Sequence, residues 1–375
     1  MAEIEIGGAK RGRLTYGFDD IALVPSRRTR DPEGVSLAWR IDAYSFEHPV
    51  IAAPMDSVVS PASAATLGGF GGLAVLNLEG LWTRHADPEP LLAEIRGLAP
   101  ASATRRLQEL YATPIDVDLI GARIAEVRAS GVTVAGSLSP QRTQQHWKTV
   151  VDAGVDLFVI RGTTVSAEHV AADGDGDRTP LDLKRFIYEL DVPVIVGGCA
   201  TYQTALHLMR TGAAGVLVGF GGGASHTTRD VLGLQVPMAS AVADVAAARR
   251  DYLDESGGRY VQVIADGSMG RSGDLAKAIA CGADAVMVGS PLARATDAPG
   301  AGMHWGLEAA HADLPRGELV HLGTVGTLDQ IMNGPSERSD GTMNLLGALR
   351  RAMATCGYSE LKELQRVEIS VSARG

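Results

Sequence analysis

Eight short apolar runs, spread over most of the chain, constrain its fold more than any other feature of the sequence. Each run is rich in Val, Ile, Leu and Ala and ends in Gly, Pro, Asp or Ser. Such runs are typical of strands that are buried on both faces of a parallel sheet. The runs are PVIAAPMD (49–56), LAVLNLEG (73–80), VTVAGSLSP (132–140), VDLFVIRG (155–162), VPVIVGG (192–198), AGVLVGFG (214–221), YVQVIADG (260–267) and ADAVMVGS (283–290).

Segments with helical periodicity separate most of these runs. QRTQQHWKTVVDAG and YQTALHLMRTG, for example, place apolar residues three and four positions apart and close with Gly, a common stop for a helix. Eight strands alternating with helices over about 240 residues predict an α/β fold of the (β/α)₈ TIM-barrel class. A doubly wound open sheet is the alternative, because the sequence does not reveal the order of the strands.

The remaining segments predict a single domain over residues 1–375, with the barrel core at 48–295 and extensions at both ends. The segment between the second and third runs, at about 50 residues, is longer than a usual crossover. It has room for two helices, but not for an inserted domain.

Composition narrows the class of protein. The formal net charge of −10 disfavours a nucleic-acid partner, because an acidic surface repels phosphates. Three cysteines, far apart in sequence, predict no disulfide framework and indicate a reducing compartment. The N-terminus has no signal-peptide pattern, no run of about 20 apolar residues could span a bilayer, and the histidines show no metal-site spacing. We therefore expect a soluble cytoplasmic protein with no membrane partner and no metal centre.

The strand ends are the expected place for chemistry, because the active sites of such barrels lie at the carboxyl ends of the strands. The seventh and eighth runs end in ADGS (265–268) and VGSP (288–291). Small residues there leave backbone N–H groups open to an anion, and the phosphate site of many barrels is built from these two loops. The pattern predicts a phosphorylated ligand; the alternative is that these glycines only permit tight turns.

The sixth run leads into a glycine-rich loop, VGFGGGASHTTRD (218–230). Its glycines match the G-x-G-x-x-G/A pattern of dinucleotide-binding folds, but that pattern should continue into a helix and meet an acidic residue at the end of the next strand. Here VLGLQVP (231–237) shows no helical period, and Asp244 lies inside the helical segment 238–253. The loop is better interpreted as one that wraps a ligand.

Ordered segments along nearly the whole chain resemble the IMP dehydrogenase/GMP reductase family. VIADGS (263–268) is similar to the Asp-Gly-Gly strand end of the family. The longer segments that resemble its motifs are LTYGFDDIALVP (14–25), AAPMDSVV (52–59), LGGFGGLAVL (67–76), KAIACGADAVMVGSPLA (277–293), GTVGTLD (323–329) and LLGALRRAMATCGYSELKEL (345–364).

The resemblance implies a barrel that binds a purine nucleoside monophosphate and assembles as a homotetramer. Met55 would contact the base or ribose, and Asp266 would accept the ribose hydroxyls. The phosphate would be surrounded by Gly223, Gly267, Met287, Gly289 and Ser290, and Val325 and Gly326 would lie near the base. The short 81–131 segment leaves no room for the regulatory CBS modules of full-length IMP dehydrogenases.

The family's chemistry requires a cysteine thiolate that attacks C2 of the purine, while hydride passes between C2 and NAD or NADP. The family loop, V-G-x-G-x-G-S-x-C-T-T-R, aligns without a gap from Val218 to Arg229. His226 then takes the place of the cysteine, and Ala224 that of a phosphate-contacting serine. His226 and Thr228 are the catalytic candidates. Gly219 and Gly221 are candidates for contact with the cofactor, and the carbonyls of Gly221 and Gly223 for a monovalent cation.

Other family positions also differ in this chain. Arg161 takes the place of the aspartate that holds the cofactor ribose, Gly198 that of an asparagine and Leu217 that of an arginine. Arg161 therefore either favours the extra phosphate of NADP or excludes NAD. No tyrosine occurs between 261 and 357 to supply the family's water-activating Arg–Tyr pair.

Three hypotheses for function follow. The chain is an IMP dehydrogenase-related oxidoreductase of guanine nucleotide metabolism, converting IMP to XMP with NAD; or a purine-nucleotide-binding homologue without turnover; or an enzyme with GMP reductase-like activity. Cys199, at the end of the fifth run, is an alternative nucleophile, although a lone cysteine there is more often an inert packed residue.

Overall fold

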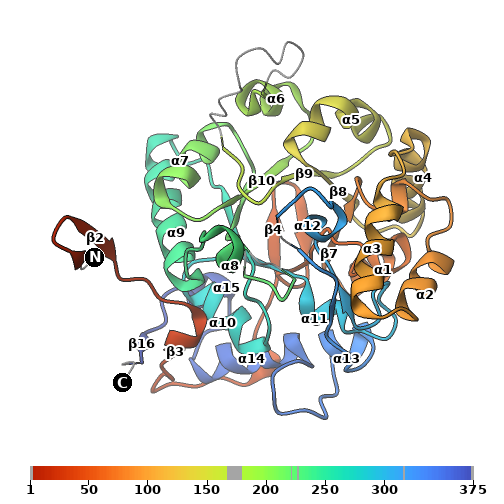
Figure 1. Cartoon of the computed structure of the whole chain (residues 1–375). Coiled ribbons are helices and arrows are strands. Elements are labelled where there is room, and N and C mark those ends of the chain that lie inside the picture. The colour runs from red at the N-terminus through yellow and green to blue at the C-terminus, as the bar shows by residue number, and fades with distance from the viewer. Residues whose placement is uncertain (1–2, 167–179, 221, 226–227, 316, 373–375) are drawn as a thin grey trace.

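The computed structural model describes residues 3–166, 180–220, 222–225, 228–315 and 317–372. Eight parallel strands close into a barrel (Figure 1), with β13 pairing back onto β6 through Val286 and Val50. The (β/α)₈ prediction is confirmed, and the doubly wound alternative is wrong, because a closed sheet has no point where strand order reverses. The barrel strands are β6 (Val50–Ala52), β7 (Leu73–Asn77), β8 (Ala135–Leu138), β9 (Leu157–Arg161), β10 (Val194–Cys199), β11 (Gly215–Val218), β12 (Gln262–Asp266) and β13 (Ala285–Val288).

Helices surround the barrel and follow the strands in sequence (Figure 1). Several begin at a side chain that caps the first turn: Ser60 accepts a hydrogen bond from the Ser63 amide, and Thr201 from the Thr204 amide. The helices between barrel strands are α1 (Pro61–Gly69), α2 (Glu89–Arg96), α3 (Pro100–Tyr111), α4 (Val117–Ala129), α5 (Pro140–Asp152), α6 (Leu183–Glu189), α7 (Tyr202–Arg210), α8 (Thr228–Leu232), α9 (Met238–Glu255) and α10 (Ser272–Ala280).

Two of these segments test the sequence predictions directly. The long connection between β7 and β8 holds α2 and α3 before α4, so the expected pair of helices is present. The glycine-rich loop, expected to continue without helical structure, instead enters the five-residue helix α8. A helix this short has too few residues to produce a visible period in the sequence.

The N-terminal extension covers the amino-terminal end of the barrel. The hairpin of β4 (Trp39–Ile41) and β5 (Tyr44–Phe46) lies there, since Trp39 Nε1 donates to Gln262 Oε1 over 3.1 Å at the start of β12. Before it, β1 (Glu3–Gly7) and β2 (Lys10–Arg13) form a hairpin that projects away from the barrel in Figure 1. β3 (Ile21–Leu23) pairs with β16 (Ile369–Val371), which joins the two ends of the chain.

The C-terminal extension forms a second apolar core beside the barrel. Leu92 of α2 and Leu107 of α3 pack there with Trp305 and Ala309, and all four are essentially inaccessible to solvent. This packing places the segment after β13 next to the barrel opening. The extension comprises α11 (Ser290–Ala293), β14 (Met303–His304), α12 (Leu307–Ala310), β15 (Val320–His321), α13 (Leu328–Met332), α14 (Leu345–Thr355) and α15 (Leu361–Leu364).

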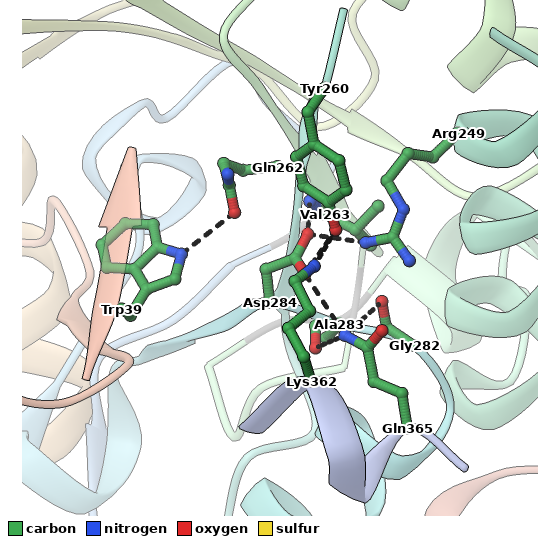
Figure 2. Close-up of polar contacts among 10 residues, drawn as sticks. All are labelled: Trp39, Arg249, Tyr260, Gln262, Val263, Gly282, Ala283, Asp284, Lys362 and Gln365. Atoms are coloured by element: carbon green, nitrogen blue, oxygen red, sulfur yellow. Dashed lines mark hydrogen bonds and ion pairs between the residues drawn. The ribbon is translucent and has the colours of Figure 1, made fainter. Parts of the chain in front are cut away.

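A cluster of charged side chains lies at the amino-terminal ends of β12 and β13 (Figure 2). Asp284, directly before β13, pairs with Arg249 of α9 over 2.7 Å and with Lys362 of α15. It also accepts hydrogen bonds from Tyr260 Oη at 2.9 Å and from the Val263 amide at 2.8 Å. These contacts therefore hold α15, the last helix, against the barrel.

A helix that spans a bilayer must be long and continuously apolar. No helix in the described part of the chain is long and apolar enough to cross a membrane.

Candidate functional site

A cavity opens at the carboxyl-terminal ends of the barrel strands. It is lined from the ends of β6, β9, β11, β12 and β13, from the glycine-rich loop, and from the C-terminal extension. Most residues predicted for a ligand site lie on it: Met55, Arg161, Gly219, Gly223, Asp266, Gly267, Met287, Gly289 and Ser290. The fold thus brings together strand ends that are up to about two hundred residues apart in sequence.

Other predicted residues lie elsewhere. Within the described residues, Val325 and Gly326 do not line the cavity; their backbones bond to Arg294 and Thr296 in the C-terminal extension. Thr228 is fully buried at the start of α8. His226 and Gly221 lie outside the described residues, so their assigned roles, including the cation site at Gly221, stay predictions.

Small residues shape one end of the cavity. The glycine-rich loop approaches the turn after β12, where the Ser268 amide donates to the Gly222 carbonyl over 3.2 Å. A Cβ atom added at Gly222 would lie 2.4 Å from Ser268 Oγ, so this approach requires glycine. The Ala224 amide points to Ser290 Oγ at 3.4 Å, which joins the loop to the start of α11. The glycine-rich loop, the turn after β12 and the start of α11 thus meet where the sequence predicts a phosphate.

A charged pair also lines the cavity. Arg161, the last residue of β9, donates from Nε to Asp266 Oδ2 over 3.1 Å, with 21% and 14% of the two side chains exposed. Burial opposes the charge on Arg161, but the carboxylates of Asp266 and Glu308 outweigh it and raise the pKa of the guanidinium. The residue expected to receive a ribose therefore already has a cationic partner.

The C-terminal extension adds lining residues that sequence reasoning missed. Glu308 of α12 and His304 of β14 both lie on the cavity. Thr163 Oγ1 donates to Glu308 Oε1 over 3.2 Å, and His304 Nδ1 lies 3.0 Å from Ser57 Oγ. No signal in the sequence marks these residues, because they follow the last barrel strand and their place depends on the packing of the second core.

The three cysteines have thiols with raised pKa values. Cys199 has no exposed surface, its Sγ donates to the Leu217 carbonyl over 3.4 Å, and burial raises the pKa of its thiol to about 12. Burial likewise raises the pKa of Cys281 to about 12 and raises that of Cys356. None of the three lines the cavity among the described residues. A thiol in these surroundings is not a nucleophile at neutral pH.

A buried carboxyl lies behind the cavity. Asp56 follows Met55, has 1% of its surface exposed, and accepts hydrogen bonds from Tyr111 Oη and from the Leu81 amide at 2.8 Å. Tyr111 Oη in turn accepts a hydrogen bond from the Trp305 indole over 3.1 Å. Burial raises the pKa of Asp56 to about 6, although the hydrogen bonds oppose the rise. This chain of contacts connects the strand-end turn to the extension that carries His304 and Glu308.

Comparison with known proteins then decides the family. The model of the IMP dehydrogenase/GMP reductase domain matches residues 15–310. The chain belongs to the IMP dehydrogenase/GMP reductase family. An uncharacterized oxidoreductase of Mycolicibacterium smegmatis is 55% identical over 99% of this chain and 100% of its own length. The inosine-5′-monophosphate dehydrogenase of Methanocaldococcus jannaschii is 36% identical over 94% of this chain and 91% of its own.

A solved structure agrees with the family assignment. The IMP dehydrogenase/GMP reductase-like protein of Corynebacterium glutamicum superposes with a TM-score of 0.92 and is 50% identical, covering 99% of this chain and 98% of that one. The family resemblance expected from the motifs is therefore confirmed over nearly the whole chain. Relatives in this family are named as oxidoreductases.

A metal site requires several ligating side chains that converge on one point. In the described ranges, no three His, Cys, Asp or Glu side chains converge as a metal site would require.

Proposed function

We propose that this member of the family binds a purine nucleoside monophosphate in the cavity, without the family's cysteine-dependent hydride transfer. One observation carries the proposal: Met55, Asp266, Gly289 and Ser290 line a single cavity although they come from three different strand ends. By the family resemblance, these residues contact the base, the ribose and the phosphate of a nucleotide. The small residues Gly223, Gly267 and Gly289 line the cavity together with Ser290, and small residues at strand ends suit a phosphate because they let it approach the backbone closely.

The described structure and the family resemblance provide no cysteine nucleophile for the family's reaction. The sequence contains three cysteines, and the resemblance places His226, not a cysteine, at the nucleophile position. Cys199, the cysteine closest in sequence to a strand end, is buried with a thiol pKa of about 12. Covalent attack on C2 by a thiolate is therefore not available from these residues.

The family generally uses NAD. Three described positions bear on whether this chain holds NAD as the family does. Arg161 stands where an aspartate would hold the cofactor ribose, and it is paired with Asp266. A Cβ at Gly198 would lie 2.4 Å from the Gly219 carbonyl oxygen, so no asparagine fits that backbone, and Leu217 is fully buried. The residues do not fit the family's mode of holding NAD or NADP, and we derive no step through either cofactor.

A second candidate function is turnover, as IMP oxidation with NAD or as GMP reduction with NADPH. The observation in its favour is that relatives 53–55% identical over nearly the whole chain are called oxidoreductases. This candidate requires a nucleophile other than cysteine, and His226 is the residue at that position.

Titration calorimetry with IMP, XMP and GMP tests the binding proposal. We expect binding of at least one of them and weaker binding of the nucleoside without phosphate. Gly222→Ala should lower affinity, because its Cβ would press on Ser268. Gly121→Ala on α4, where an added Cβ meets nothing within 4 Å, is the matched control. If none of the three nucleotides binds, the proposal is wrong.

Absorbance assays for NADH formation from IMP and NADPH consumption with GMP test the second candidate. Binding without either reaction supports the first function. Turnover that disappears in His226→Ala while binding remains would establish the second instead.

Family members are generally oligomeric, and we propose a homotetramer in the cytoplasm for this chain. Light scattering during size-exclusion chromatography would give the oligomeric state directly.

A further inference from the structure

Arg161 lines the cavity together with two carboxylates, Asp266 and Glu308. Arg161 contacts Asp266 through Nε at 3.1 Å, and the charge of Glu308 also acts on its guanidinium. The contact between Arg161 and Asp266 joins β9 to β12, whereas Glu308 belongs to α12 of the C-terminal extension. Nothing in the family resemblance assigns a role to Glu308.

Glu308 is held firmly in this position. Its neighbour Ala309 is buried in the second core, and the Ala309 carbonyl accepts a hydrogen bond from Gln108 Nε2 of α3 over 3.3 Å. Thr163, two residues after Arg161, donates to the Glu308 carboxylate. The contact with Thr163 therefore holds the Glu308 carboxylate on the same side of the cavity as the end of β9.

The pairing leaves Asp266 able to accept further hydrogen bonds. Within the described residues, its side chain makes one polar contact, through Oδ2 to Arg161. A carboxylate has roughly four acceptor sites, so two ribose hydroxyls can bind while Arg161 stays in place. The guanidinium would then hold the carboxylate in one orientation before the ligand arrives, which lowers the entropic cost of binding.

We propose that Arg161 is a positioning residue that orients Asp266 for the two ribose hydroxyls of the bound nucleotide. The inference rests on the proposed function, because it assumes that a nucleotide ribose binds at Asp266. On this proposal, Arg161 controls recognition of the ribose and not of the phosphate or the base.

The same geometry argues against a cofactor phosphate at Arg161. Two carboxylates and one guanidinium leave this end of the cavity with a formal charge of −1, which repels a 2′-phosphate. An arginine that binds phosphate needs an uncompensated charge or open donor pairs. The alternative in which Arg161 selects NADP is therefore disfavoured.

Affinities for ribo- and 2′-deoxyribonucleotides test the proposal. Titration calorimetry would measure IMP against 2′-deoxy-IMP, and GMP against 2′-deoxy-GMP, for the wild type and for Arg161→Met. The wild type should prefer the ribonucleotide, and in Arg161→Met we expect this preference to fall roughly tenfold, the size of one charge-assisted hydrogen bond. Arg161→Lys, which keeps the charge but not the Nε donor, should give an intermediate preference.

Glu308→Gln removes a nearby carboxylate charge and keeps an oxygen that can accept from Thr163. Its ribose preference should stay at the wild-type value, because the contact between Arg161 and Asp266 remains. Arg185→Met is the matched control, because Arg185 on α6 is highly exposed and pairs with Glu189 outside the cavity. Thermal unfolding of each variant would verify that it folds.

The possible results distinguish a failure of the proposed nucleotide binding from a failure of the positioning role alone. If the wild type binds no purine monophosphate, the proposed function fails and this inference fails with it. If it binds them but Arg161→Met and Arg161→Lys keep the wild-type ribose preference, only the positioning role is wrong. A loss of preference in Glu308→Gln as large as in Arg161→Met would show that the charge of Glu308, and not the contact between Arg161 and Asp266, controls ribose recognition.

Discussion

The two ends of the barrel each carry an aspartate paired with an arginine, but the pairs differ in depth and in number of contacts. At the amino-terminal end, Asp284 and Arg249 have 1% and 7% of their side chains exposed, and Asp284 has further partners in Lys362 and Tyr260 (Figure 2). At the carboxyl-terminal end, Arg161 and Asp266 are more exposed and make one contact with each other.

This difference separates a structural pair from a functional one. Asp284 has its hydrogen-bonding capacity used within the protein, and its partners come from α9, α15 and β12. Asp266 lies on a cavity and retains acceptor capacity. A barrel of this kind is expected to concentrate stability at one end and ligand contacts at the other. The comparison predicts that equivalent substitutions at the two ends change different measurements.

The largest effect is expected at the amino-terminal end. Asp284→Ala removes the carboxylate from a buried arginine, which is expected to lower the free energy of unfolding by about 3–5 kcal/mol. Urea denaturation measures this loss. Glu189→Ala, which breaks an exposed pair with Arg185, is the control and should change stability little. If Asp284→Ala were as stable as the wild type, burial of the Asp–Arg pair would not distinguish the two ends of the barrel.

Asp56 lies at the cavity end of the barrel but is buried like Asp284. It therefore tests whether burial or position in the barrel determines how an aspartate affects stability. Its pKa is about 6 in the folded chain against 3.8 for the ordinary group. Folding is then favoured by protonation of Asp56: this stability is fully present below about pH 4 and is lost as the pH rises through about 6. By pH 7 the loss approaches about 3 kcal/mol.

Asp56→Asn should therefore gain stability relative to the wild type as the pH rises from about 4 to about 7. The asparagine oxygen can accept from Tyr111 and Leu81, and its amide would occupy the place of Oδ1, which has no partner among the described residues. Thermal unfolding over this pH range measures the difference, with the exposed Asp87→Asn as control. A stability difference that does not change with pH would contradict the raised pKa.

At the cavity end, Asp266→Asn reverses the pattern expected for Asp284. We expect purine monophosphate affinity to fall by about tenfold to a hundredfold, because a charged acceptor of the ribose hydroxyls is lost. The free energy of unfolding should change by only about 1 kcal/mol, since Arg161 keeps Glu308 nearby. Calorimetry with IMP and GMP and urea denaturation test both values. An intact affinity with a large loss of stability would make Asp266 a structural residue like Asp284.

The same contrast explains how much the sequence could predict. The apolar runs identified every barrel strand, because strands buried on both faces have a composition that neighbouring segments lack. The strand-end residues Met55, Asp266 and Gly289 were found for the same reason: once the strands are located, their carboxyl ends are known.

Contacts across the cavity could not be predicted in this way. The pairing of Arg161 with Asp266 depends on strand tilt and side-chain conformation, which local patterns do not encode. Glu308 reaches the cavity because α12 packs on α3 in a separate core, about two hundred residues away in sequence. The charged cluster around Asp284 was missed similarly, since its members come from distant elements and each alone resembles a surface residue.

The smallest effect is expected for Cys199, which lies at the cavity end of β10 but behaves like a core residue. Its thiol is fully buried, and a pKa of about 12 leaves almost no thiolate at neutral pH. Cys199→Ala should lower the free energy of unfolding by only about 1 kcal/mol and leave nucleotide affinity unchanged. Any turnover should persist as well, because the sulfur does not reach the ligand. If the variant lost turnover while binding nucleotides normally, Cys199 would be the nucleophile, and position at a strand end would matter more than burial.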